Sequence, residues 1–444
     1  MRAPWRPPTE SPAAAAALPA NSPRGGLGAR VASLRTFEAL EDRSFRWFMV
    51  SMLAQFSSMH MQMVVNPWLV YELTGSYAKL GAIALASAIP GLVLGFPGGV
   101  VADRASKKLL VQGGQAVNAL STLAIAVLIW FDAITFVHLM IVGGIQGGVW
   151  AVMGPARQAL VPEIVGTARL TNAVALNMAG MNFTRLGVPA LGGFLIAWIG
   201  AGGVYALMAG LIFVAMFALI PVRPLEGLDG TARAGTPWGG LGREVKRTLV
   251  ETGEGIAYMR RDATIFAVLM VNFFIVLMSM PYMQMMAGFV KDVLGGGPEA
   301  LGLLLSVTGI GSLVGSLAIA SMPNRGRGLA FLLSALVLGV ALLAFSISTW
   351  LWVTALIMVV IGLGQAGRMS LSNILLMAYT QPSLQGRVMS VYMMEFSLVS
   401  FGIFLVGVLA EVVGVQWAIG TTAVSLIVIS LAALAFVPRV RALP

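Results

Sequence analysis

Long stretches without charged residues recur along the whole chain, and they constrain its fold more than any other feature. Between Arg46 and Glu72 lie 25 residues with no charged side chain. Six more gaps of 23 to 28 residues are bounded by Lys79 and Asp103, Lys108 and Asp132, Asp132 and Arg157, Asp262 and Lys291, Glu299 and Arg325, and Glu411 and Arg439. A helix needs about 20 apolar residues to cross the hydrocarbon core of a bilayer. The sequence therefore predicts a helical membrane protein that crosses the bilayer many times.

Twelve membrane spans fit the pattern of apolar stretches in the 444 residues. The first six are predicted at 45–71, 79–102, 108–131, 135–156, 171–199 and 203–221. The second six are predicted at 263–290, 300–322, 328–347, 350–378, 387–411 and 416–437. The composition agrees, because only 10% of the residues are charged, against about 25% in a soluble domain.

The distribution of basic residues predicts the orientation of the chain. Of the 28 Lys and Arg residues, 24 lie in the N-terminal tail, the central loop, the C-terminus and the loops on the same side of the bilayer. Lys79 and Lys291 lie in the opposite loops, and Arg185 and Arg368 lie inside spans. Basic residues collect in cytoplasmic loops. We therefore expect a multi-pass protein of the cell inner membrane with both termini in the cytoplasm, which an even number of spans allows.

The spans divide into two halves of nearly equal length. A disordered cytoplasmic tail is predicted at 1–44, a six-helix bundle at 45–222, a cytoplasmic linker at 223–262, a second six-helix bundle at 263–438 and a short cytoplasmic tail at 439–444. The halves repeat weakly, since Gln146 and Gln365 occupy similar places 219 residues apart. Two pseudo-symmetric bundles with a site between them near the midplane are typical of rocking transporters. The predicted fold class is thus an all-α membrane protein of this architecture.

Several classes of function are excluded by residues that the chain lacks. It has no cysteine and two histidines, His60 and His138, so thiolate and histidine-rich metal sites are excluded. It also lacks the phosphate-binding loop of nucleotide-driven transporters and the clustered carboxylates of a membrane-embedded enzyme. The net charge of +10 lies in loops and needs no nucleic-acid partner. We expect no cofactor, no enzyme activity, and a monomer whose partners are the lipid bilayer and a small-molecule substrate.

The loop after the second span carries the most specific motif in the sequence. Residues 99–108 read Gly-Val-Val-Ala-Asp-Arg-Ala-Ser-Lys-Lys. This segment resembles the loop signature of the major facilitator superfamily. The resemblance implies that Gly99 lets helices approach closely, and that four charged residues form a network across the cytoplasmic gate: Asp103, Arg104, Lys107 and Lys108.

Other segments narrow the resemblance to one branch of that superfamily. Residues 68–76 (Trp-Leu-Val-Tyr-Glu-Leu-Thr-Gly-Ser), 159–163 (Ala-Leu-Val-Pro-Glu) and 185–193 (Arg-Leu-Gly-Val-Pro-Ala-Leu-Gly-Gly) resemble bacterial exporters, as does 385–390 more weakly. That branch, of the transmembrane secretion effector type, includes enterobactin exporters and drug-efflux relatives. The resemblance covers about residues 40–437 and implies export by alternating access.

Two positions depart from the pattern of proton-coupled antiporters in this superfamily. Many of them carry an arginine in the fourth helix, three residues before a Gln-Gly pair, where this chain has Gly143. Their fifth helix usually carries Gly-Pro, where this chain has Val188 and Pro189. Both departures weaken the case for ordinary proton-coupled drug antiport.

Charged residues inside the bilayer are the strongest site candidates, because each costs about 2.5–3.5 kcal/mol at the centre of a helix. Arg185 lies near the middle of the fifth span, where it either contacts substrate or ties helices together. Arg368 and Glu395 lie at similar depths on consecutive spans. They form either a fixed ion pair or a switch in which Glu395 takes up a proton and frees Arg368.

Uncharged polar residues near the midplane complete the candidate site. His60 is either a neutral, hydrogen-bonded histidine or a group that titrates near physiological pH. Gln62 and Asn66 are four residues apart and share a helix face. Gln146 and Gln365 line the cavity if the resemblance holds. Tyr282 follows Pro281, which is expected to break or kink the seventh span.

The sequence thus predicts a secondary transporter that exports an amphipathic organic molecule, siderophore-like or drug-like. The charges inside the spans are two arginines and one glutamate, which favours an anionic or zwitterionic substrate. Protons are one option for the coupling ion, through Glu395 or His60. A gradient-driven facilitator or importer, or a lipid transporter of the same fold, stays open as the alternative.

Overall fold

A computed structural model describes residues 35–166, 169–223, 225, 253, 262–323, 325–381 and 384–443. Within these ranges the regular elements are helices, and no strand occurs. They are η2 (Arg35–Glu41), α2 (Arg43–Thr74), α3 (Tyr77–Arg104), α4 (Lys107–Trp130), α5 (Phe136–Val165), α6 (Leu170–Ala218), α8 (Ala263–Ser279), α9 (Pro281–Asp292), α10 (Pro298–Ala320), α11 (Arg327–Ile347), α12 (Leu351–Tyr379), α13 (Gln385–Val413), α14 (Val415–Phe436) and α15 (Pro438–Arg441).

The helices account for the twelve predicted spans. In the described part of the chain, nine helices are long and apolar enough to cross a membrane, with α8 and α9 counted as one. Another of the nine, α6, breaks at Gly200, which has φ 72° and ψ 168°, and so forms two passes. The remaining two are α2 and α13, which are 32 and 29 residues long. The all-α membrane fold is therefore confirmed.

Local sequence explains where several helices begin and end. The Asp42 carboxylate accepts a hydrogen bond from the Phe45 N–H at 3.0 Å and caps α2. Gly75 ends that helix with φ 60°, in the left-handed region that favours glycine. Ser76 then caps α3. As predicted, Pro281 interrupts the seventh span, since α8 ends at Ser279 and α9 begins at the proline.

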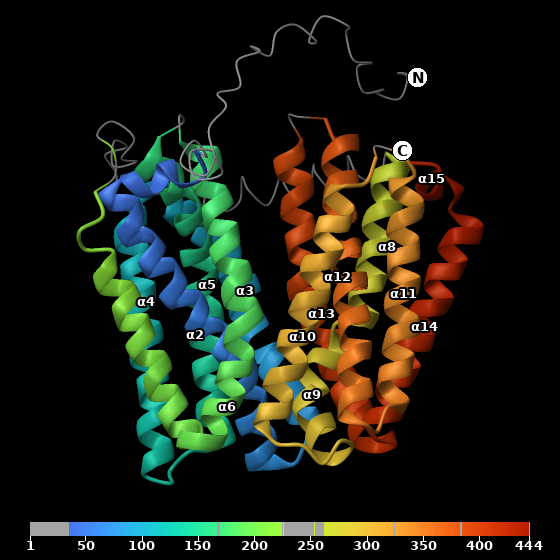
Figure 1. The fold of residues 1–444 in the computed structure, drawn as a ribbon, viewed down its shortest axis with the longest axis horizontal. Helices are drawn as coiled ribbons and strands as arrows, with labels where there is room; N and C mark the ends of the chain where they lie inside the picture. Colours follow the sequence, from blue (N-terminus) through green and yellow to red (C-terminus); the bar gives the residue numbers. More distant parts are fainter. Residues whose placement is uncertain are drawn as a thin grey trace, which may run out of the picture.

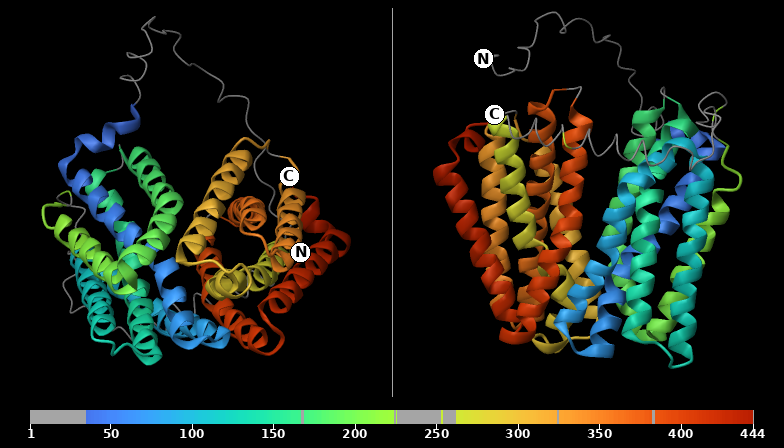
Figure 2. Two further views of the ribbon diagram at one scale, coloured as in Figure 1. Left: turned by 60° about the horizontal axis from the view of Figure 1, so that its bottom comes forward. Right: turned by 180° about the vertical axis from the view of Figure 1, so that it is seen from behind.

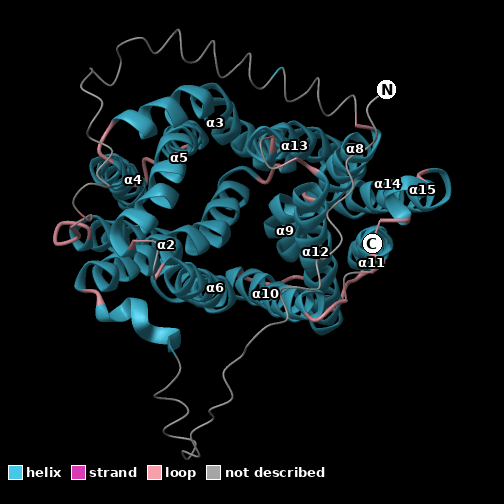
Figure 3. Cartoon of the chain, turned by 90° about the horizontal axis from the view of Figure 1, so that it is seen from above, coloured by secondary structure: helices cyan, strands magenta, loops and turns pink. Residues whose placement is uncertain are grey.

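The helices pack as two groups, α2 to α6 and α8 to α14 (Figure 1). The groups meet where α6 packs against α10 and where α3 packs against α13, as the view along the helices also shows (Figure 3). The N-terminal end of α2 and helix α15 lie at the same end of the molecule. We call this the terminal end, and we call the opposite one the distal end.

Contacts between the two groups gather in the half of the molecule toward the distal end. There Gly193 of α6 lies against Gly302 of α10, and Gly407 of α13 lies against Tyr77 of α3. The Ala190 N–H also donates a hydrogen bond to the Ser306 hydroxyl at 2.9 Å. Toward the terminal end the helices of the two groups diverge (Figure 2). The structure is therefore closed at the distal end and spread apart at the terminal end.

Glycines allow equivalent helices in the two groups to cross closely. A Cβ on Gly147 of α5 would collide with the Ser87 carbonyl oxygen of α3. A Cβ on Gly311 of α10 would collide with the Val359 carbonyl oxygen of α12 in the same way. Gly99 differs from these, because no neighbouring atom lies within 4 Å of its added Cβ. The close approach that the resemblance implies for Gly99 is therefore absent in this conformation.

The predicted N-terminal tail is partly ordered, which corrects the boundary at residue 44. Residues Arg35–Glu41 form a 3-10 helix that packs against α6. Its Ala39 N–H donates to the Asn172 side-chain oxygen at 3.0 Å, and Arg169 lies 3.6 Å from Glu38 and 3.5 Å from Glu41. This network holds the segment in place. Residues 1–34 and nearly all of the predicted linker lie outside the described residues, so both stay predictions.

Candidate transport site

Arg368 and Glu395 lie in one buried network of the second group, and Asn272 of α8 connects them. The Arg368 Nη1 donates to the Asn272 Oδ1 at 3.1 Å. The Asn272 Nδ2 donates to the Glu395 Oε2 at 2.6 Å. Arg368, Asn272 and Glu395 are 0%, 1% and 6% exposed, respectively. Three helices, α8, α12 and α13, therefore bring a buried cation and a buried carboxylate together around one amide.

A direct ion pair, one of the two alternatives for Arg368 and Glu395, is not formed in this conformation, since these two described residues make no N–O contact within 4 Å. The Asn272 side-chain amide lies between them. Its oxygen accepts a hydrogen bond from Arg368, and its nitrogen donates one to Glu395. The Arg368 Nε has no hydrogen-bond acceptor. Tyr392, which lies 3.1 Å from the Ser372 hydroxyl, interacts with the guanidinium. The arginine is thus held by polar groups and is not neutralised by contact with a carboxylate.

The polar residues of the first group are linked in the same manner. The Gln62 Nε2 donates to the Gln146 Oε1 at 2.5 Å, and the Gln146 Nε2 donates to the Thr122 hydroxyl at 3.4 Å. His60 is 6% exposed, and its Nδ1 lies 2.8 Å from the Phe56 carbonyl oxygen. His60 is therefore hydrogen-bonded to its own helix, as one of the two predictions for it stated. Gln62 and Gln146, predicted on different helices, are direct partners.

Arg185 lies in the middle of the first pass of α6, and its side chain is exposed at this depth. In the described part of the chain it forms no ion pair. It lies close enough to His60 and Tyr282 for electrostatic interaction with both. Since Tyr282 belongs to the second group, the Arg185 side chain faces residues of both groups.

Tyr282 and Gln365 connect Arg185 to the buried network of the second group. Tyr282 is 3% exposed, and its hydroxyl, which faces Arg185 and Gln365, has no partner at hydrogen-bonding distance. The Arg368 Nη2 lies 3.5 Å from the Gln365 Oε1. A contiguous series of polar residues therefore runs from Arg185 to Glu395. Asn66 is half-buried, and its side-chain oxygen has no partner.

Sequence reasoning missed a second buried arginine. Arg157 was placed in a loop, because the fourth span was predicted to end at residue 156. In the structure α5 continues to Val165, and Arg157 is 6% exposed. Both of its terminal nitrogens lack a partner, and its guanidinium lies 5.1 Å from the Phe56 ring. The apolar residues that follow Arg157 (Leu160, Val161, Ile164 and Val165) were the signal that the helix continues.

The predicted gate motif lies at the terminal end of the first group. The Lys107 Nζ lies 2.5 Å from the Glu163 Oε1, and both side chains are mostly buried. The Lys108 Nζ donates to the carbonyl oxygens of Ile220 and Val222 at 2.8 Å. The side chains of Asp103 and Arg104 lie outside the described residues, so their predicted contacts stay predictions. The two lysines thus hold the motif against α5 and the end of α6.

We expect Lys107→Met to destabilise the fold by about 2 kcal/mol, because it leaves the buried Glu163 carboxylate without a partner. Thermal unfolding of the purified protein in detergent measures the effect. The double variant Lys107→Met/Glu163→Leu serves as the control. It should recover most of the lost stability, since neither member of the pair then leaves a buried charge without its partner. Equal melting temperatures for the single and double variants would contradict this assignment.

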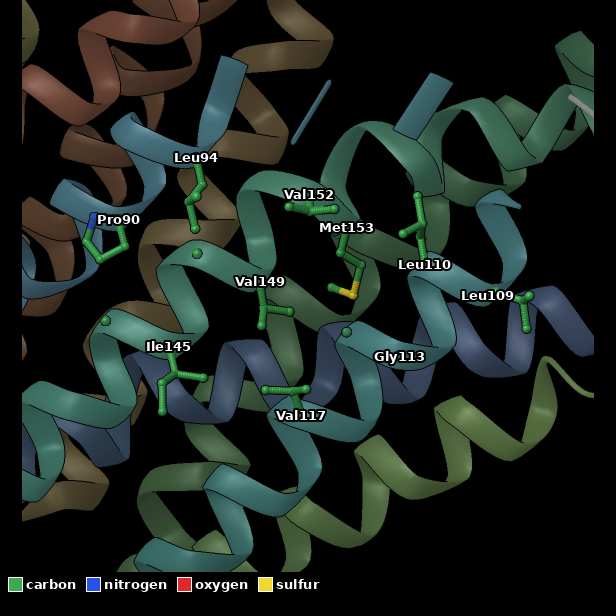
Figure 4. A pocket seen from close by; sticks show the side chains of 13 residues that line it. Pro90, Leu94, Leu109, Leu110, Gly113, Val117, Ile145, Val149, Val152 and Met153 are labelled. Carbon is green, nitrogen blue, oxygen red and sulfur yellow. The ribbon is translucent and has the colours of Figure 1, made fainter. Parts of the chain in front are cut away.

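A pocket of about 440 Å³ lies between α3, α4 and α5 (Figure 4). Its lining is apolar and includes Pro90, Val117 and Met153. Leu109 and Val117, which also line it, are 68% and 44% exposed. Such a surface suits contact with lipid chains. None of the predicted site residues lies in this pocket. Among the described residues, no group of three or more His, Asp or Glu side chains could hold a metal ion.

Comparison with known proteins places the chain among membrane transporters. A family model described as transmembrane secretion effector matches residues 34–443. The multidrug efflux pump Tap of Mycolicibacterium fortuitum is 25% identical over 391 residues, which are 86% of this chain and 92% of that protein. The staphyloferrin A transporter of Staphylococcus aureus is 21% identical over 82% of this chain and 89% of that protein.

The fold is also similar to that of solved transporters. One is a bacterial homologue of the human lysosomal transporter Spinster, in an inward-facing and unoccupied conformation. The TM-score is 0.67 at 15% identity, and the match covers 89% of this chain and 97% of that one. This similarity concerns the fold alone.

Proposed function

The chain belongs to the transmembrane secretion effector family of the major facilitator superfamily, and from this premise we propose that it exports an amphipathic organic molecule by alternating access. The observation that carries the proposal is the exposed Arg185 side chain, which faces His60 and Tyr282 between the two groups. The names of the relatives, an efflux pump and a siderophore transporter, support export of a drug-like or siderophore-like compound.

We place the terminal end in the cytoplasm, with the protein in the cell inner membrane as a monomer. The excess of Lys and Arg at that end supports this orientation. The molecule is then in an inward-facing state, closed toward the outside. The halves 45–222 and 263–438 move against each other around the central site, while Lys107, Lys108, Asp103 and Arg104 act where the cytoplasmic end closes.

The central residues divide into a substrate site and a coupling site. Arg185, His60 and Tyr282 contact the substrate, together with Gln62, Asn66 and Gln146. Arg368 and Glu395 lie in the coupling site, and Gln365 connects the two sites. A series of polar contacts can couple two sites when it has two alternative arrangements. A substrate bound at Arg185 therefore changes the relative populations of the two arrangements of the network that contains Glu395.

Arg185, which forms no ion pair among the described residues, favours a substrate with an anionic group. We expect Arg185→Gln to weaken binding of an acidic amphipathic compound about tenfold or more, because a charge-assisted hydrogen bond is lost. Binding of a neutral compound of similar size should change little. Tryptophan fluorescence quenching or calorimetry on the purified protein measures both. Arg185→Lys is the matched control, since it keeps the charge and should retain most of the preference.

The substrate assignment would be wrong if Arg185→Gln reduced the affinity for acidic and neutral compounds equally. That outcome would indicate a structural role for the arginine. A facilitator that follows the substrate gradient is the second candidate for the mechanism. The absence of an arginine at Gly143 favours it.

A further inference from the structure

Two carboxylates of the second group reach across the distal end to the turn that joins α2 and α3. The hydroxyls of Tyr71 and Tyr77 both donate to the Asp292 Oδ2, the second at 2.9 Å. The Glu411 Oε2 accepts from the Tyr77 N–H at 2.8 Å and from the Ser76 hydroxyl at 3.1 Å. These hydrogen bonds join the two groups where the molecule is closed.

The local sequence explains why this turn offers so many donors. Gly75 ends α2 and lets the chain reverse at once into α3. The first N–H groups of α3 have no partner within their helix, and the positive end of a helix favours a carboxylate. The rings of Tyr71 and Tyr77 pack with centroids 4.9 Å apart, which points both hydroxyls at one acceptor. Residues 68–76, which resemble bacterial exporters, thus form one side of a contact between the groups.

We propose that Asp292 and Glu411 form a proton-sensitive latch that holds the outer end closed. The inference rests on the proposed orientation, in which the distal end faces outside. Both carboxylates are exposed, so protons from the outer solution reach them. An ionised carboxylate accepts hydrogen bonds only, and such charge-assisted bonds are roughly twice as strong as neutral ones. Protonation therefore weakens the latch and favours opening to the outside.

The other charged or titratable groups at this end form no ion pair with Asp292 or Glu411 in the described part of the chain. On the helices around it these groups are Glu72 of α2, Lys79 of α3, His138 of α5, Lys291 of α9 and Glu299 of α10. Lys79 lies over the Phe136 ring, and His138 bonds to Thr135. In the described part of the chain, neither Asp292 nor Glu411 forms an ion pair. The acceptors are thus engaged by tyrosine hydroxyls, a serine hydroxyl and backbone N–H groups.

The test measures the distance between the outer ends of the two groups. Because the chain has no cysteine, spin labels attach only at introduced cysteines. Phe131 and Trp350 suit labelling, since they are 78% and 75% exposed and lie in distal loops of different groups. Double electron–electron resonance then reports the share of molecules open to the outside, at neutral pH and at about pH 4, near the ordinary pKa of carboxyl groups, without any compound or gradient.

We expect the parent protein to be mainly closed at neutral pH and to open at acidic pH. In the double variant Asp292→Asn/Glu411→Gln the ratio of open to closed molecules at neutral pH should be higher by about tenfold or more. Acidic pH should raise this ratio little further. Tyr71→Phe removes one donor only and should give a smaller shift in the same direction. Glu72→Gln is the matched control, because Glu72 is exposed at the same end and its side chain makes no hydrogen bond to another described residue.

The latch is refuted if the double variant keeps the parent's distances at both pH values, or if Glu72→Gln opens the protein as much. The measurement requires no transport, so its result is independent of the proposed export. If acidification opened the double variant further by as much as it opens the parent protein, the responsible proton would lie elsewhere, and the proposal would likewise be overturned.

Discussion

Glu395→Gln is expected to abolish proton movement that depends on a transported compound. Glutamine keeps the size of the side chain and can still accept the hydrogen bond from the Asn272 amide, which is 2.6 Å from the carboxylate. It cannot take up or release a proton. The Glu395 side chain is almost fully buried beside Arg368. A solvent-exposed carboxylate therefore does not take over its role in carrying the proton. Proteoliposomes that contain a pH-sensitive dye measure the proton flux.

His60→Ala is the control for this prediction. His60 is the other group in the central region that could carry a proton, but its Nδ1 is already bonded to the Phe56 carbonyl oxygen. We expect coupled flux to persist in His60→Ala. If flux persisted in Glu395→Gln and disappeared in His60→Ala, the coupling role would belong to the histidine and not to the network around Arg368.

Gly302→Val is expected to drive the two groups apart at the distal end and to stop transport. A Cβ at Gly302 of α10 would collide with the Pro189 carbonyl oxygen and the backbone of Gly193 on α6. Backbone atoms cannot turn away as a flexible side chain can, and overpacking of this kind costs about 1–3 kcal/mol. Since 1.4 kcal/mol corresponds to a factor of ten, the population should shift about fivefold to a hundredfold toward the outward-open state.

Gly187→Val is the matched control for this prediction. Gly187 lies on the same pass of α6, but no neighbouring atom lies within 4 Å of its added Cβ. The distance between labels at positions 131 and 350 measures both variants. The account requires a longer distance for Gly302→Val and an unchanged one for Gly187→Val. Unchanged distances and normal transport in Gly302→Val would show that the α6–α10 contact does not determine closure of the distal end.

Much of the fold could be predicted from the sequence, because the spacing of charges limits where a span can begin and end. The reasoning failed at Arg157, a charge that lies inside a helix close to its end. Arg157 was taken as the end of the fourth span, yet α5 continues for two more turns and buries it between Phe48 and Phe56. Aromatic rings of α2 accommodate this guanidinium, and spacing along one helix cannot reveal a partner on another.

The candidate site was predicted in its residue types but not in its connections. Depth along the spans placed Arg368 and Glu395 at similar levels, yet Asn272 is the residue that joins them. Depth along a helix is set by the sequence, whereas the lateral distance between helices depends on packing. The cross-group contacts of Asp292 and Glu411 could not be predicted for the same reason, since they join segments more than 200 residues apart.

The most direct test of gradient-driven export is transport by the unmodified protein in proteoliposomes, with an imposed proton gradient and a panel of acidic and neutral amphipathic compounds. The account predicts that an acidic compound moves against its own gradient, and that protons move in the opposite direction only when the compound is present. Movement of the compound that is indifferent to the proton gradient would contradict proton-coupled export. The protein would then be a facilitator in which the Arg368–Asn272–Glu395 network has only a structural role.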